Sequence, residues 1–247
     1  MQILSISSSV RPCLMPSLLR IARFVTPLLL ASTWWMAVSV HAAGGHHAVD
    51  DAGLVEPGRC QLEVWADRYG AASRGVVHVG TACRLGAFEL GANLDRSSAS
   101  GESSSVAYGV QAKWVRSIAD SLTGGVLVAA TWQGTAPRSF VGASVILPLT
   151  WQATDTLQMH ANLGRDFRNS AAHTNRAGVA LEWSPSSEWS FIAERYQESK
   201  SNFWRTGARY TINANLSVDL THASDIRRGD GAASAWWTLG VNWAFDR

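Results

Sequence analysis

The sequence is poor in charged residues and in long apolar runs. Charged side chains make up 16% of the chain, whereas about 25% is usual in soluble globular proteins. The positive charges form no tail or cluster, which argues against a nucleic-acid partner. After residue 42, no stretch contains the ~18 consecutive apolar residues that indicate a transmembrane helix. These absences disfavour a nucleic-acid-binding protein and a helical membrane protein.

Cysteine is also scarce, with three residues in the chain. No Cys-x-x-Cys pair occurs, so a zinc site is not expected, and no motif requires another metal or a cofactor. His46 and His47 are adjacent, but an isolated pair in a polar segment is more often ordinary sequence than a metal site.

The first 42 residues have the pattern of an export signal. Three arginines precede an apolar stretch over residues 24–40, and small residues predict cleavage between Ala42 and Ala43. A proline and several polar residues interrupt the stretch, which disfavours the alternative of an uncleaved anchor. The segment holds three of the 21 Lys+Arg and none of the 19 Asp+Glu, so its removal changes the net charge from +2 to about −1.

The remaining sequence alternates between apolar and polar positions with a period of two. In residues 88–95, apolar side chains at even positions alternate with Glu, Gly, Asn and Asp. Segments of about 9–11 residues with this pattern are typical of transmembrane β-strands. Two of the segments are apolar on both faces (121–133 and 139–151), and Pro148 removes one ladder donor from the second. About twelve strands are predicted, over residues 58–68, 75–85, 88–95, 106–114, 121–133, 139–151, 157–166, 176–183, 189–197, 204–210, 216–221 and 237–245.

This pattern predicts an all-β fold, an antiparallel up-and-down transmembrane β-barrel in the cell outer membrane. Bacterial barrels of this kind have even strand numbers and alternate short turns with longer loops, as this chain does. We therefore expect a signal peptide over 1–42, a periplasmic lead-in over 43–57 and the barrel over 58–247, with both termini periplasmic. A soluble β-sandwich or lipocalin-like barrel is the alternative. Two belts of tryptophan favour the membrane: Trp151, Trp183 and Trp189 near tight turns, and Trp132, Trp204 and Trp236 near longer loops.

Two further features support an exported barrel. The last strand carries a polar-x-Gly-x-x-hydrophobic-x-hydrophobic pattern that resembles the signal read by barrel-assembly machineries, although two residues follow its last aromatic position. Cys60 and Cys83 are placed symmetrically about the first predicted turn, so they would face each other if residues 67–68 pair with 75–76. An oxidising compartment then favours a disulfide. The residues of the assembly signal are Thr238, Gly240, Trp243 and Phe245.

Charged residues on the polar strand faces are predicted to line the lumen. Their mixed signs favour ion-paired packing in a narrow barrel, and a small channel between them is the alternative. The candidates are Glu63, Glu89, Asp95, Lys113, His160, Arg176, Glu182, Arg205, Arg209 and Asp219.

One motif suggests catalysis. Outer-membrane lipid hydrolases carry His-x-Ser on the barrel exterior, and His222-x-Ser224 lies on the lipid-facing side here. However, Asp225 follows where such enzymes resemble His-x-Ser-Asn, and no oxyanion hole is recognisable. We therefore do not expect an enzyme.

Residues 49–63, VDDAGLVEPGRCQLE, resemble the start of the mature chain in a known family. This is the outer-membrane transporter family named for the MetA pathway of phenol degradation, whose members open with Asp-Asp-Ala/Thr-Gly followed by Gly and a Gln/Glu-Leu-Glu strand. The resemblance implies an outer-membrane β-barrel that passes small molecules, but neither a phenol substrate nor any catalytic residue.

We accordingly expect a channel or transporter for small solutes, aromatic ones included. Its other partners would be outer-membrane lipids and the barrel-assembly machinery. A non-conducting barrel with a structural, adhesive or assembly role is the first alternative, and a lipid hydrolase using His222 and Ser224 is the second.

Overall fold

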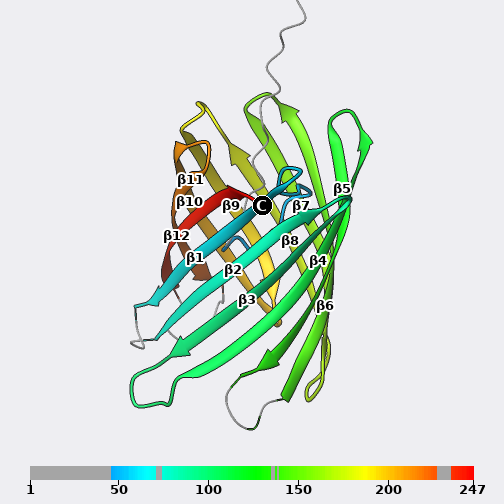
Figure 1. The fold of residues 1–247 in the computed structure, drawn as a ribbon. Helices are drawn as coiled ribbons and strands as arrows, with labels where there is room; N and C mark the ends of the chain where they lie inside the picture. Colours follow the sequence, from blue (N-terminus) through cyan, green and yellow to red (C-terminus); the bar gives the residue numbers. More distant parts are fainter. Residues whose placement is uncertain (1–45, 71–73, 135–136, 138, 227–234) are drawn as a thin grey trace, which may run out of the picture. The chain divides into compact units, whose positions relative to one another are not determined.

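The computed structural model describes residues 46–70, 74–134, 137, 139–226 and 235–247, and in these ranges the chain forms twelve strands. Each strand pairs antiparallel with its neighbours in sequence, and β1 pairs with β12 to close the barrel (Figure 1). The predicted all-β up-and-down barrel is confirmed. The strands are β1 Arg59–Tyr69, β2 Gly75–Leu85, β3 Phe88–Ser98, β4 Ser105–Ala119, β5 Leu122–Gln133, β6 Ser139–Thr154, β7 Leu157–Arg168, β8 Thr174–Trp183, β9 Trp189–Glu198, β10 Ser201–Asn213, β11 Leu216–Asp225 and β12 Ala235–Asp246.

Two further expectations concern membrane-spanning helices and export. Within the described ranges, no helix has the length and apolar character needed to cross a membrane. The predicted cleavage site between Ala42 and Ala43 lies outside the described residues, so the signal peptide stays a prediction.

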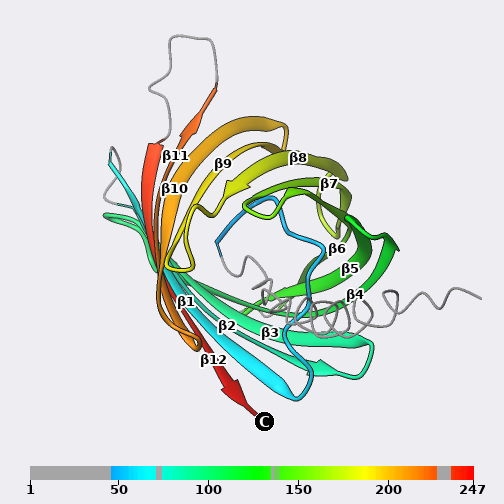
Figure 2. The ribbon, with the colours of Figure 1, turned by 90° about the horizontal axis from the view of Figure 1, so that it is seen from above.

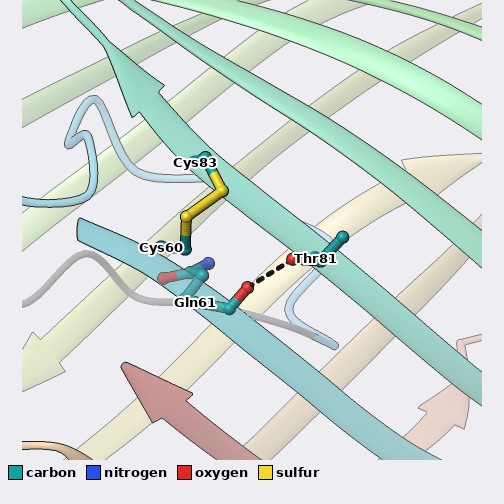
Figure 3. Close-up of a disulfide and its surroundings, with 4 residues drawn as sticks. All are labelled: Cys60, Gln61, Thr81 and Cys83. Carbon is teal, nitrogen blue, oxygen red and sulfur yellow. Dashed lines mark hydrogen bonds between the residues drawn. A yellow bond between two sulfur atoms is a disulfide. The ribbon is translucent and has the colours of Figure 1, made fainter. Parts of the chain in front are cut away.

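The first hairpin has the register that the cysteine positions predict. Cys60 pairs with Cys83, and Asp67 pairs with Val76. A disulfide joins the two cysteines, and the Thr81 hydroxyl donates a hydrogen bond to the Gln61 carbonyl at 3.0 Å beside it (Figure 3). Because β1 also pairs with β12, this bridge lies next to the seam that closes the barrel.

The outer face of the barrel is apolar. Leu163, Val179, Leu220 and Leu239 are each more than half exposed, at positions that alternate with buried or partly buried ones. In water such a surface would be unfavourable, but it matches a hydrocarbon environment. Aromatic rings contact one another near both ends of the strands: Trp183–Phe191 and Trp189–Tyr210 near the tight turns, and Tyr108–Trp132 and Trp132–Phe140 near the other end.

One tryptophan of the predicted belts lies elsewhere. The prediction placed Trp236 in the outer belt, but this residue is 6% exposed and faces the lumen. Successive strand residues point to opposite faces, so its neighbour Trp237, which is 55% exposed, takes the outward position.

Pro148 lies at an interruption of the β5–β6 ladder. The pairing of these strands omits Gly125 and Val126 opposite Pro148 and Leu147, and resumes in the same register on both sides. The proline therefore lies where no ladder hydrogen bond to β5 depends on its missing N–H group.

Candidate functional site

The inner face of the barrel is lined by charged side chains whose pairing follows from the strand register. Arg205 on β10 lies opposite Glu194 on β9, and Arg209 on β10 lies opposite Asp219 on β11. Opposite charges across an antiparallel pair attract each other. The Arg205 Nη1–Glu194 Oε1 distance is 3.3 Å, and the Arg209 Nε–Asp219 Oδ1 distance is 2.6 Å.

Further ion pairs and histidine–carboxylate contacts between strands extend this network around the lumen. They join strands β2 to β3 and β7 to β9, so most of the circumference contributes. The contacts are His78–Asp95 at 2.6 Å, Arg176–Asp166 at 2.7 Å, Arg176–Glu198 at 2.9 Å and His160–Glu182 at 3.5 Å.

The ten residues predicted to face the lumen all lie on this inner face. Their partners, however, were not predicted, because the pairing depends on register and on the chain inside the barrel. Five of them are buried, namely Glu89, Lys113, His160, Arg205 and Asp219. The other five are partly buried, namely Glu63, Asp95, Arg176, Glu182 and Arg209.

Residues 46–57 run through the interior of the barrel rather than outside it (Figure 2). The prediction for residues 43–57 is a periplasmic lead-in, of which residues 43–45 lie outside the described ranges. Instead, Val49, Ala52 and Val55 are each at most 7% exposed. The physical reason is that the wall offers hydrogen-bonding or charged partners to residues 46, 48–52 and 55.

Carboxylates of the wall accept hydrogen bonds from the main chain of the segment. Glu194 on β9 accepts from the N–H groups of Ala48 at 3.2 Å and Val49 at 2.9 Å. Glu89 on β3 accepts from the N–H group of Val55 at 2.8 Å. A carboxylate that accepts main-chain hydrogen bonds makes charge-assisted contacts, which are stronger than neutral ones.

Other wall residues complete the main-chain contacts. The N–H group of Ala52 donates to Oγ1 of Thr150 on β6 at 2.8 Å. Arg205 donates to the carbonyl of His46, and Arg84 on β2 donates to the carbonyl of Val55 at 3.3 Å. The wall thus binds an extended peptide by both its N–H and its C=O groups.

Lys113 on β4 binds two of the three acidic side chains of the segment. Its Nζ lies 3.0 Å from Oδ1 of Asp50 and 3.1 Å from Oδ1 of Asp51. The Lys113 side chain is 5% exposed, so its charge is largely removed from water. The amide of Asn162 lies within hydrogen-bonding distance of the main-chain N–H and C=O groups of Asp50.

A small apolar contact fixes the middle of the segment. Val49 packs against Ala180, Ile192 and Tyr196. A Cβ atom added at Gly178 on β8 would lie 2.6 Å from a methyl group of Val49, so this close approach requires glycine there.

The histidine pair at the start of the segment also lies in the lumen, with ring centroids 4.4 Å apart. Burial, followed by the nearby charges of Arg205 and Arg209, lowers the pKa of His46 to about 3. Burial, followed by His46 and the same arginines, lowers the pKa of His47 well below 6.5. Both imidazoles are therefore neutral at pH 7. In the described part of the chain, no cluster of three His, Cys, Asp or Glu side chains could hold a metal ion.

Four aromatic rings lie on the inner face at the end of the barrel opposite the tight turns. Ring centroids are 5.1 Å apart for Tyr69–Trp236, 5.5 Å for Phe203–Trp236 and 5.2 Å for Tyr196–Phe203. The Arg205 guanidinium lies 5.5 Å from the Tyr196 centroid and 5.8 Å from that of Trp236. The lumen therefore offers planar apolar surfaces beside its charges.

The His222-x-Ser224 motif lies on the outer surface at the end of β11. His222 packs against Trp237, with ring centroids 4.8 Å apart. Among the described residues, no hydrogen bond joins His222 to Ser224, so the geometry does not show the base–nucleophile contact that a hydrolase would need.

The occupied lumen was not predicted from the sequence, although one signal for it is present. Val49, Ala52 and Val55 recur at every third position of an otherwise small and polar segment, and these are its buried apolar residues. A period of three fits neither a β-strand nor an amphipathic helix, so a search for those periods passes over it.

The barrel is similar to solved structures of porins and transporters at low sequence identity. The KdgM porin has a TM-score of 0.60 and 10% identity, covering 75% of this chain and 99% of its own. The NanC porin has a TM-score of 0.58 and 11% identity, covering 74% and 98%. The toluene transporter TodX of P. putida has a TM-score of 0.51 and 9% identity, covering 78% and 91%. At such identities the likeness establishes the fold.

A comparison with curated proteins finds no matching relative. The model of one protein family does match, over residues 31–245, and this range includes both the segment in the lumen and all but the end of the barrel. The chain belongs to this family, which is described as "Uncharacterised conserved protein UCP029691".

Proposed function

We propose that the protein is an outer-membrane channel for small solutes. The observation that carries the proposal is the opposite character of the two barrel faces. The outer face exposes apolar side chains such as Leu163 and Leu239, whereas the inner face carries paired charges such as Arg209–Asp219. A closed barrel satisfies its backbone in hydrocarbon, and a charged interior favours water and polar solutes.

The remaining expectations fit this proposal. Residues 1–42 would direct export and be removed before Ala43. The last strand would present Thr238, Gly240, Trp243 and Phe245 to the barrel-assembly machinery, since it is the strand that closes the barrel against β1. Outer-membrane lipids would surround the apolar face. The porin and transporter folds and the resemblance of residues 49–63 to the MetA-pathway transporters support the same assignment.

Small aromatic solutes are the class that the lumen supports best. The partly exposed inward rings of Tyr69 and Phe203 can stack on planar molecules, and Arg205 lies beside the buried rings of Tyr196 and Trp236 that they contact. TodX, whose fold is similar, is named as a toluene transporter. Uptake of benzoate and of a non-aromatic acid of similar size into liposomes tests this class. Tyr69→Ala is expected to reduce benzoate uptake selectively, and equal losses for both acids would contradict the aromatic preference.

Channel function is tested by planar-bilayer recording of the refolded mature chain. We expect discrete openings with a cation preference, because carboxylates outnumber cationic groups on the inner face. Glu63→Gln with Glu182→Gln should lower the ratio of cation to anion permeability. The matched control is Glu188→Gln, since Glu188 is exposed in a tight turn outside the lumen. The absence of openings in the mature chain and in every variant would contradict the channel and favour the non-conducting barrel.

The non-conducting barrel is retained as the second candidate because residues 46–57 occupy the lumen. We do not propose a lipid hydrolase. The contact of His222 with Trp237 gives the motif an interfacial packing role instead.

A further inference from the structure

In the contacts between residues 46–57 and the barrel wall, each kind of wall group meets a group of complementary chemistry on the segment. Wall carboxylates meet main-chain N–H groups, wall guanidinium groups meet main-chain carbonyls, and a wall ammonium meets two side-chain carboxylates. These wall residues come from β2, β3, β4, β9 and β10. The inner face is therefore a binding site for one extended, acidic peptide, which here is part of the same chain.

Lys113 makes both of its ion pairs with the segment, although Glu89 on β3 lies opposite it on the wall. Within the described residues, both of its ion pairs are with the segment, to Asp50 and Asp51. By contrast, Arg209 keeps Asp219 as a partner on the wall whether or not the segment is present. The contact of Lys113 with the acidic pair is thus specific to the bound state.

We propose that residues 46–57 are a removable plug, bound to a peptide site in the lumen through Lys113, and that the channel conducts when the plug leaves. This inference rests on the proposed channel function. The inner-face side chains then form a binding site whose ligand is residues 46–57, an arrangement that a simple pore would not require.

The character of the contacts explains why the segment can leave. Most of them are hydrogen bonds and ion pairs, and the apolar contact is limited to a few residues around Val49. In a lumen, unlike in a closed core, water can solvate Lys113 and Glu194 after the segment departs. Dissociation therefore leaves solvated charges rather than buried unpaired ones.

The segment ends in a tight turn where it joins the barrel. Gly58 has a φ of +79°, in the left-handed region that favours glycine, and it connects the segment to β1. The main-chain N–H of Arg59 donates to the carbonyl of Glu56 at 3.0 Å, which closes the turn into the lumen. Cleavage before Ala43, as the sequence predicts, would leave the other end of the segment as the chain terminus.

The first experiment compares the mature chain with a variant that lacks residues 46–57, in planar bilayers. We expect the deletion to raise the mean conductance at least several-fold. A synthetic peptide of residues 46–57, added from the side of the tight turns, should then block the deleted barrel. The same peptide with Asp50→Asn and Asp51→Asn should bind roughly 10- to 100-fold more weakly, since it loses the charge-assisted contacts to Lys113.

A second variant tests the same proposal in case the deletion variant does not fold. Asp50→Asn with Asp51→Asn in the full chain leaves every strand unchanged and should also raise the open probability. The matched control is Asp155→Asn, because Asp155 is exposed in a tight turn and away from the lumen. If this control raises the open probability as much, the plug assignment is overturned.

The outcomes separate this inference from the proposed function. Equal conductance in the mature chain, the deletion and the Asp50/Asp51 variant overturns the plug and leaves the channel intact. Binding of fluorescently labelled peptide to the deleted barrel in detergent, with no conductance in any variant, overturns the channel and the gating role while keeping the peptide site. Failure of the labelled peptide to bind the deleted, folded barrel overturns the peptide site itself.

Discussion

Acidification should release residues 46–57 from the lumen. His46 and His47 are held there as neutral imidazoles, facing Arg205 and Arg209 on β10 and, for His47, also His160 on β7. Protonation next to two guanidinium groups is unfavourable, whereas a released imidazole protonates freely in water. The bound state therefore takes up fewer protons than the released state once the pH falls through the ordinary histidine range.

The magnitude follows from the difference in pKa. The His46 pKa is about 3 in the bound segment, against 6.5 for an unperturbed histidine. Above pH 6.5 neither state is protonated, so binding is unaffected, and below it the released state gains stability until the pH approaches the bound pKa. Between pH 7.5 and 5.5 this gain is about 1.4 kcal/mol per histidine, or roughly tenfold in the dissociation constant. Two histidines acting independently give roughly 100-fold.

The Asp50 carboxyl works in the opposite direction. Burial raises the pKa of the Asp50 carboxyl, against the opposing effect of Lys113. A raised carboxyl pKa means that the bound state holds its proton more tightly, so acidification favours binding through this group. The total pH dependence is therefore smaller than the histidine contribution, and a comparison of variants is needed to isolate that contribution.

The assay measures binding of a labelled peptide of residues 46–57 to the barrel that lacks them. Its dissociation constant at pH 7.5 and 5.5 is compared with that of a peptide carrying His46→Gln and His47→Gln, which cannot protonate. Between pH 7.5 and 5.5, we expect the fold increase in the dissociation constant to be at least ten times larger for the unmodified peptide than for the substituted one. If both peptides show the same pH dependence, the histidines are not the sensor and this reasoning is refuted.

Three other predictions concern the barrel itself. Cys60→Ala with Cys83→Ala removes a bond spanning 23 positions and should lower the free energy of unfolding by about 3 kcal/mol in urea titrations in micelles. Reduction of the unmodified chain should reproduce this loss, and a change below about 1 kcal/mol would contradict it. Leu163→Arg places a charge on the outer face in the middle of β7, where Leu163 is 66% exposed, and should lower the free energy of unfolding in lipid by about 2–4 kcal/mol. Its effect on binding of the peptide of residues 46–57, measured in detergent without urea, should be much smaller. Ser224→Ala should leave any lipid hydrolysis by the preparation unchanged, and a loss would revive the hydrolase alternative.

Most strands were predictable because each carries its own signal, whereas β5 and β6 are apolar on both faces. Alternation in residues 88–95 is enough to assign β3 and its inward face, and the positions of Cys60 and Cys83 are enough to set the register of the first hairpin. Period two arises from the backbone of a single strand, so it needs no knowledge of the partner. Strand ends were less accurate: β4 extends to Ala119 and β6 to Thr154, where the apolar pattern had already faded.

The plug was not predictable in the same way. Its contacts join Asp50 to Lys113 and Val49 to Glu194, and no local period connects these positions. The inner-face residues could be identified by parity, but parity does not reveal whether a carboxylate on that face meets a neighbouring strand or a chain in the lumen. A segment bound by side chains has no ladder, and the spacing of Val49, Ala52 and Val55 matches the period of neither a strand nor an amphipathic helix.

The plug gives a physical meaning to the motif that suggested a transporter family. In residues 49–63, Asp50 and Asp51 hold Lys113, and the Asp51 carboxylate also accepts the main-chain N–H of Gly53 at 3.0 Å, which bends the segment inside the lumen. Gly58 supplies the left-handed turn that leads out of the lumen and into β1. A motif that marks only the start of a barrel would have no need for an acidic pair, whereas a plug needs charges that the wall can bind and a tight turn at the point of exit. Chains that share the Asp-Asp pair together with this glycine should therefore also place a cationic side chain on the inner face at the level of Lys113. A barrel with the motif but with an uncharged residue at every such inner position would show that the motif serves another purpose.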